Sequence, residues 1–191
     1  MMVAMEDMPD CNIILRITGD DILIDPTYLN LTIQEYKSNN SDYTDAKNLP
    51  SGTEVEVFSK EALLFINNYF KDTSGTEYLT NYFKSISEHF RSSSLKPKKS
   101  FNNLRLTLDT QEDFDVISKL VNYFSEIGMK YDYSIEDIDK YFNKFPEQKL
   151  INSDIKQRVI PPKFNTEVNW NYFSSGPLVS VYITCFNKSL Y

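Results

Sequence analysis

The stretch that decides the fold is IILRITGDDILIDP, residues 13–26. It opens with a short apolar run rich in β-branched residues and ended by Gly19, which predicts a buried strand over 12–18. Two carboxylates, Asp20 and Asp21, follow the glycine directly. The sequence therefore predicts a strand that carries acidic side chains at its end.

A helix is expected to begin directly after this stretch. Asp25 can cap free N–H groups, and Pro26 suits the first helical position, so we expect a helix from there to about Lys37. The other expected elements are a strand at 53–59, a helix at 60–70, a helix opening near Thr76, a polar connection at 91–103, a strand at 104–109, and helices at 110–127 and 134–142. This alternation of strands and helices predicts an α/β domain with a largely buried sheet.

Composition narrows the class of protein. The 191 residues are 41% hydrophobic, enough for a core, and the formal net charge of −7 disfavours nucleic-acid binding. The two cysteines, Cys11 and Cys185, are far apart, which indicates a reducing, cytoplasmic location. His89 is the one histidine, and we interpret it as a surface or half-buried helix residue. With no signal-peptide pattern and no apolar run of about 20 residues, no membrane span is expected.

Acidic residues end two of the expected strands. Asp20 follows the first strand and Asp109 ends the strand at 104–109. Ligands of open α/β sheets bind outside the carboxyl ends of strands, where two such carboxylates would suit a hard divalent cation such as Mg²⁺. The alternative is that both are ordinary residues of a turn and a helix start.

Four segments carry a family resemblance. LRITGDDILIDPTYLN, SGTEVEVFSKEAL, TSGTEYLTNYF and NLRLTLDTQEDFDVISKL occur in this order within 12–152. Together they resemble cytidylyltransferases of the spore-coat polysaccharide type, relatives of the enzymes that activate acylneuraminate and 3-deoxy-manno-octulosonate as CMP-sugars. The resemblance implies a GT-A-like nucleotide-diphospho-sugar transferase fold and a reaction of CTP with a sugar that releases pyrophosphate. It also implies Mg²⁺ held by Asp20 and Asp109 as the catalytic residues.

The same resemblance suggests substrate-binding residues. Asp21 is a candidate for supporting the metal ligands, and Glu56 and Glu77 are candidates for contacts with sugar hydroxyls. For Glu77 the alternative is an acid that stabilises the first turn of a helix. Arg16 and Arg105 could face phosphate or a carboxylated sugar, and each could equally pair with a neighbouring acid.

One part of the family pattern has no match. Members of the family begin with a strand and a basic loop of the form Arg-x-x-Ser-x-Arg-Leu-Pro-Gly-Lys, which holds the triphosphate, and the sequence contains nothing similar. We therefore expect 1–152 to be the C-terminal two-thirds of a cytidylyltransferase-like domain, with the first strands and the nucleotide-binding loop absent. An exposed sheet edge or apolar face is then expected, and a missing N-terminal half or a homodimer partner could cover it.

The end of the chain has a different character. Residues 153–176 contain breakers without periodicity and are interpreted as a linker. Residues 177–191 resemble the first strand of family 2 glycosyltransferases, which would make the parent protein a bifunctional cytidylyltransferase-glycosyltransferase. The alternative is one more strand of the same domain. Two functional hypotheses follow: a cytidylyltransferase fragment, or a non-catalytic remnant or interaction module that lacks the CTP-binding loop.

Overall fold

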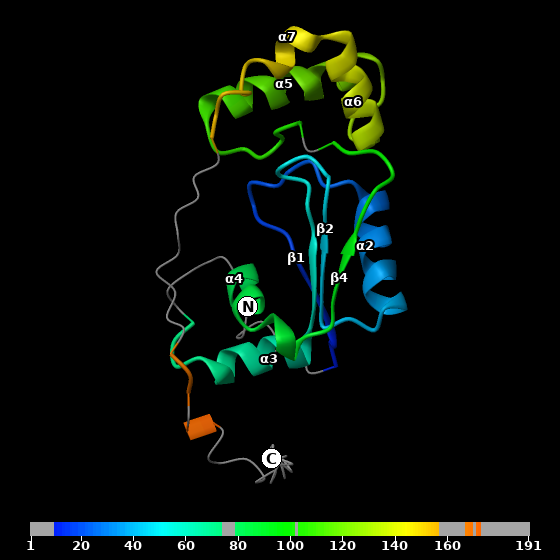
Figure 1. Ribbon diagram of the computed structural model, residues 1–191. Helices are drawn as coiled ribbons and strands as arrows, with labels where there is room; N and C mark the ends of the chain where they lie inside the picture. The colour runs from blue at the N-terminus through cyan, green and yellow to red at the C-terminus, as the bar shows by residue number, and fades with distance from the viewer. Residues whose placement is uncertain (1–9, 74–78, 102, 157–166, 170, 173–191) are drawn as a thin grey trace, which may run out of the picture.

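The computed structural model describes residues 10–73, 79–101, 103–156, 167–169 and 171–172. Its centre is a four-stranded sheet in the order β1-β3-β2-β4, which lies at the middle of the molecule in Figure 1. The strands are β1 (Ile13–Arg16), β2 (Tyr43–Ala46), β3 (Glu56–Ser59) and β4 (Ser92–Leu95). Strand β3 is antiparallel to both β1 and β2, whereas β2 and β4 are parallel. The predicted α/β class is confirmed, with a mixed sheet.

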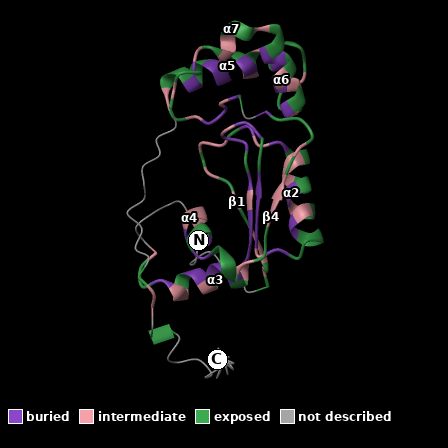
Figure 2. Cartoon of the chain, viewed as in Figure 1, coloured by how far each residue is buried: buried purple, intermediate pink, exposed green. Residues whose placement is uncertain are grey.

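Burial differs across the sheet. All of β2 and most of β3 are buried, as the colouring of Figure 2 illustrates. The expectation of a buried first strand was wrong, because three residues of β1 are only half-buried and Leu15 is 38% exposed. The reason is its place in the sheet: in the part of the chain that the structure describes, β1 pairs with β3 alone.

Two of the four strands were not predicted. Strand β4 lies within 91–103, which was expected to be a polar connection, and β2 follows the loop signal that ends the first helix. Both are polar, and β4 pairs with β2 along its whole length. On one face of this pair, the hydroxyls of Thr44 and Ser93 lie 2.8 Å apart, so polar side chains are satisfied inside the sheet.

The predicted strand at 104–109 does not join the sheet. Its one ladder contact is an isolated parallel bridge between Arg105 and Ser51. The alternation of the sequence is nevertheless real, because Leu104 and Leu106 are buried. The segment therefore runs extended along the turn near Ser51 rather than along a neighbouring strand.

Four of the described helices begin where the sequence predicts caps. The helices are α2 (Pro26–Ser38), α3 (Lys60–Tyr69), α4 (Leu79–Ser85), α5 (Gln111–Glu126), α6 (Ile135–Lys144) and the short α7 (Pro146–Lys149), with a 3-10 turn at Ser87–His89. Asp25, Ser59, Thr110 and Ser134 each accept a hydrogen bond from the first turn of their helix. The predicted opening near Thr76 lies outside the described residues.

The helices lie around the sheet in three groups. Helix α2 packs on one face, while α3 and α4 join β3 in a core on the other face. Helices α5, α6 and α7 lie beyond one end of the strands (Figure 1), and α5 and α6 form a second core with Leu104 and Leu106. Asp25 links two groups, because its carboxylate accepts from Thr27 N in α2 and from Ile135 N at the start of α6.

Part of the expected linker contacts the domain. Val168 forms an antiparallel bridge with Phe70, and the backbone of Asn169 donates to the carbonyl of Tyr69. The segment 177–191, which resembles the start of a glycosyltransferase, lies outside the described residues.

Gly52 allows the extended segment to approach the sheet. It has φ +91°, and a Cβ at this position would lie 2.2 Å from the backbone nitrogen of Thr107. The flanking backbone bonds, Ser51 N to the Leu104 carbonyl and Leu106 N to the Ser51 carbonyl, fix this approach. A side chain at Gly52 would therefore push the segment that leads to Asp109 away from the sheet.

We predict that Gly52→Ala lowers the free energy of unfolding by about 2 kcal/mol or more, because it combines an unfavourable φ with a backbone overlap. Gly19→Ala is the matched control. No atom lies within 4 Å of a Cβ at Gly19, so its effect should stay within about 0.5 kcal/mol. Urea unfolding of both variants measures the difference, and equal stabilities would contradict the close approach.

Candidate functional site

A cavity of about 1130 Å³ opens over the sheet face beside the end of β1. It is lined by residues of all strands but β4, by α4, and by the segments around 18–21, 51–54, 105–110 and 155–156. Charged side chains dominate its wall: Asp20, Asp21, Asp45, Glu54, Glu56 and Asp109 are acidic, and Arg16, Lys47, Lys84, Arg105 and Lys156 are basic. Oppositely charged groups therefore share one cavity.

Asp20 and Asp109 come together at this cavity. The backbone N–H of Leu108 donates to the carbonyl of Asp20 at 3.1 Å, which joins the turn after β1 to the end of the extended segment. A hydrogen bond with Thr18 lowers the pKa of the Asp20 carboxyl, and a contact with the Asp109 side chain acts in the same direction. The structure thus brings together the two carboxylates that end the expected strands, 89 residues apart in sequence.

Asp21 has a different environment from its neighbour. Its carboxylate accepts from the Thr18 hydroxyl at 2.5 Å, and its backbone N–H donates to the Thr18 carbonyl. Burial raises the pKa of the Asp21 carboxyl, and the nearby charge of Asp20 adds to this rise. Asp21 therefore closes the turn that presents Asp20 to the cavity.

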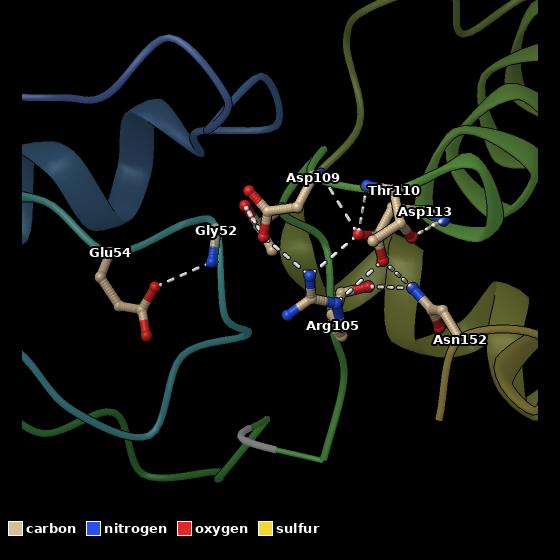
Figure 3. Close-up of polar contacts among 8 residues, drawn as sticks. Gly52, Glu54, Arg105, Asp109, Thr110, Asp113 and Asn152 are labelled. Carbon is tan, nitrogen blue, oxygen red and sulfur yellow. Dashed lines mark hydrogen bonds and ion pairs between the residues drawn. The ribbon is translucent and has the colours of Figure 1, made fainter. Parts of the chain in front are cut away.

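Arg105 connects Asp109 to a buried carboxylate. Its Nε and Nη2 donate to Asp113 at 2.9 Å each, and Nη2 also donates to Asp109 at 2.7 Å (Figure 3). Asp113 is fully buried, while the Asp109 side chain is 41% exposed. The hydrogen bond with Asp113 is the main cause that raises the pKa of Arg105. The sequence left open whether Arg105 faces a ligand or pairs with a neighbouring acid, and in the structure it pairs with Asp109 and Asp113.

Asp113 and Asn152 complete this cluster. Asp113 was recognised from the sequence as part of a capping box, which the structure confirms. Its Oδ2 also accepts from the backbone N–H of Asp109 at 3.2 Å. Asn152 donates from Nδ2 to Asp113 and to the carbonyl of Arg105. No motif pointed to Asn152, and an asparagine after a short polar turn gives no signal by itself.

A second cluster surrounds Glu56 on the sheet face. Its carboxylate accepts from Arg16 Nη1 at 2.8 Å, from the Tyr43 hydroxyl at 3.0 Å and from the Thr80 hydroxyl. Arg16 is therefore paired with an acid, the alternative that the sequence left open. Burial raises the pKa of Tyr43, and the Glu56 and Asp45 charges add to this, so its hydroxyl remains a donor.

Asp45 on β2 continues this polar part of the sheet face toward β4. It accepts from the Ser94 hydroxyl at 2.5 Å and pairs with Lys47. The residues that sequence reasoning missed here, Tyr43, Asp45 and Thr80, belong to elements that were not predicted or whose register was not known. Glu77, the remaining predicted substrate-binding residue, lies outside the described residues.

The charged clusters also bear on metal binding. Among the described residues, no group of three or more His, Cys, Asp or Glu side chains is arranged to enclose a metal ion. Asp20 and Asp109 can offer two carboxylates on an open cavity wall.

None of the described helices is both long and apolar enough to cross a membrane.

Known proteins resemble this chain over most of its length. The sequence profile described as cytidylyltransferase matches residues 1–151 and ends one residue before Asn152. An uncharacterized protein of Methanocaldococcus jannaschii is 30% identical over 149 residues, which are 77% of this chain and 60% of that protein. The spore coat polysaccharide biosynthesis protein SpsF of Bacillus subtilis is 30% identical over 139 residues, 71% of this chain and 57% of SpsF. The chain thus spans about three fifths of the length of these curated relatives.

A solved structure shares the fold. The structure of a cytidylyltransferase from Leptospira borgpetersenii serovar Hardjo-bovis aligns with a TM-score of 0.71 and 22% sequence identity. The alignment covers 82% of this chain and 66% of that chain. At this identity the likeness establishes the fold.

We predict that Asp113→Asn lowers the free energy of unfolding by about 3 kcal/mol, because the mostly buried Arg105 guanidinium then keeps only the half-exposed Asp109 carboxylate as a charged partner. Asp115→Asn is the control on the same helix. Asp115 is exposed, and among the hydrogen bonds of the described residues it accepts only from Gln111, so we expect a change within about 0.5 kcal/mol. Chemical denaturation at neutral pH distinguishes the two variants, and similar losses would refute the buried ion pair.

Proposed function

This chain belongs to the cytidylyltransferase family, and from that premise we propose that its cavity forms a CMP-sugar from CTP and a sugar, with Mg²⁺ held by Asp20 and Asp109. The observation that carries the proposal is that Asp20 and Asp109 line one cavity, where the backbone N–H of Leu108 donates to the Asp20 carbonyl. Likeness to a solved cytidylyltransferase supports the assignment of the sheet to the GT-A-like class of nucleotide-diphospho-sugar transferases. The similarity to SpsF supports a place in polysaccharide synthesis.

The two carboxylates suit the proposed ion. Mg²⁺ binds proteins through one or two carboxylates and fills its remaining positions with water and phosphate oxygens. Asp20 has a lowered pKa, so it is ionised at neutral pH. When bound there, the ion would supply positive charge to the phosphate oxygens. Asp109 accepts from Arg105 through Oδ2, and Oδ1 is the oxygen that we propose for the ion once the carboxylate turns toward it.

The reaction that we propose is a substitution at phosphorus. A sugar hydroxyl oxygen bonds to the α-phosphorus of CTP, the bond to the β-phosphate oxygen breaks, and pyrophosphate leaves while the hydroxyl proton passes to solvent. Negative charge on the phosphoryl oxygens must be held and neutralised, which is the main task of the protein. Arg105 lies on the cavity wall beside Asp109, and its guanidinium, which is paired with Asp109 and Asp113, would donate hydrogen bonds to those oxygens.

The cluster around Glu56 is our candidate for the sugar subsite. Its carboxylate accepts three hydrogen bonds, and a carboxylate has room for about four. A sugar hydroxyl could take the remaining position, with the hydroxyls of Tyr43 and Thr80 as neighbouring partners. Because Arg16 neutralises Glu56, this cluster suits the hydroxyls of a sugar better than its anionic groups.

A second candidate function is a non-catalytic interaction module. It is favoured by one observation, the lack of any segment that matches the basic, glycine-containing loop with which the family holds the triphosphate. The two candidates differ in whether the chain binds CTP with Mg²⁺.

We predict that the chain binds Mg²⁺ and CTP together with micromolar affinity, and that Asp20→Asn and Asp109→Asn each weaken this binding at least about tenfold, a loss of about 1.4 kcal/mol. Isothermal titration calorimetry measures it, with Asp115→Asn as a control that should bind like the parent chain. Chelation of Mg²⁺ should abolish the binding in all variants. No binding at millimolar CTP would reject the enzymatic function and favour the interaction module.

A further inference from the structure

We propose that Asp113 and Asn152 are positioning residues that hold the Arg105 guanidinium at the cavity wall. The inference rests on the proposed function, in which Arg105 faces the phosphates. It adds two residues that are hydrogen-bonded to Arg105, one of them outside every motif in the sequence. Neither Asp113 nor Asn152 lines the cavity itself.

Asp113 holds the guanidinium by its geometry. The Nε and Nη2 donors of Arg105 meet the two carboxylate oxygens at 2.9 Å each, the paired arrangement that a planar guanidinium and a carboxylate favour. Asp113 is itself fixed, because it is fully buried and accepts from the backbone N–H groups of Asp109 and Thr110. The start of α5 therefore anchors the side chain of Arg105.

Asn152 reinforces this anchor from the other side. It is 3% exposed, and its Nδ2 donates to Oδ1 of Asp113 at 2.9 Å and to the carbonyl of Arg105 at 3.1 Å. One amide group thus touches both the backbone of Arg105 and the carboxylate that binds its side chain, as Figure 3 shows. The backbone of Ile155 bonds to the carbonyl of Asn152, and Ile155 lines the cavity.

Because of this arrangement, Asp109 can bind a metal ion without also having to hold Arg105 in place. Asp109 is exposed and must turn toward a metal ion if it is to bind one. A guanidinium held by Asp109 alone would move with that carboxylate. Because Asp113 provides two of its hydrogen bonds, Arg105 keeps its place whichever way Asp109 turns.

The test uses Asn152→Ala, which removes one amide and leaves every charge in place. We expect Arg105 to lose its fixed position, so that the distinct Nε–Hε signal of Arg105 in an NMR spectrum moves toward the signals of exposed arginines. The affinity for inorganic pyrophosphate in the presence of Mg²⁺ should fall about tenfold. Unfolding should remain cooperative.

Ser59→Ala is the matched control. It removes the cap of α3, which should cost about 1 kcal/mol of stability, and Ser59 does not line the cavity. A purely structural function for Asn152 predicts that both variants keep the Arg105 signal and bind pyrophosphate like the parent chain, and that result would overturn the proposal. Should Asn152→Ala fail to fold, Arg105→Lys decides: it keeps the charge but loses the fork, and unchanged affinity there would also overturn it.

The binding measurement and the NMR measurement distinguish this inference from the proposed function. A parent chain that binds neither pyrophosphate nor CTP would reject the proposed function, while the Arg105 signal would still report whether Asn152 holds the guanidinium. A parent chain that binds both, with an Arg105 signal unaffected by Asn152→Ala, would leave the function standing and reject the positioning.

Discussion

The buried carboxylate of Asp113 is the constraint on which the candidate site depends. It accepts five hydrogen bonds, from two donors of Arg105, the backbone of Asp109 and Thr110, and the amide of Asn152. A buried charge is stable only when it is paired and fully hydrogen-bonded. Satisfying this one group therefore fixes the start of α5, the end of the extended segment and the orientation of Arg105 together.

The rest of the cavity follows the same physical rule. The chain carries a net charge of −7, and six of its carboxylates line one space. Like charges this close would repel, but Glu56 is paired with Arg16, Asp45 with Lys47, and Asp109 with Arg105. These pairs leave acceptors and hydroxyls on β2 and β3. Among the ion pairs of the described residues, Asp20, Asp21 and Glu54 have no bonded cation, and Asp20 is the one whose pKa is lowered.

Local chemistry was predictable from the sequence, and long-range pairing was not. The caps at Asp25 and Thr110 were found because each acts on its own helix within a few residues. Strand β4 has the sequence SSSL and was not predicted as a strand, because its β conformation comes from pairing with β2 rather than from its own residues. Asn152 acts on Arg105 across 47 residues, a relation that no local pattern encodes. The meeting of Asp20 and Asp109 was inferred from a sheet edge, yet the structure achieves it with an extended segment outside the sheet.

The central claim is that Asp20 and Asp109 bind one divalent ion between them, and Mn²⁺ tests it most directly because this ion broadens the NMR signals of nearby nuclei. We expect substoichiometric Mn²⁺ to broaden the backbone amide signals of both Asp20 and Asp109 in the parent chain. Excess Mg²⁺ should restore both signals together. Broadening at only one of the two residues, or at a site away from the cavity, would contradict a shared ion.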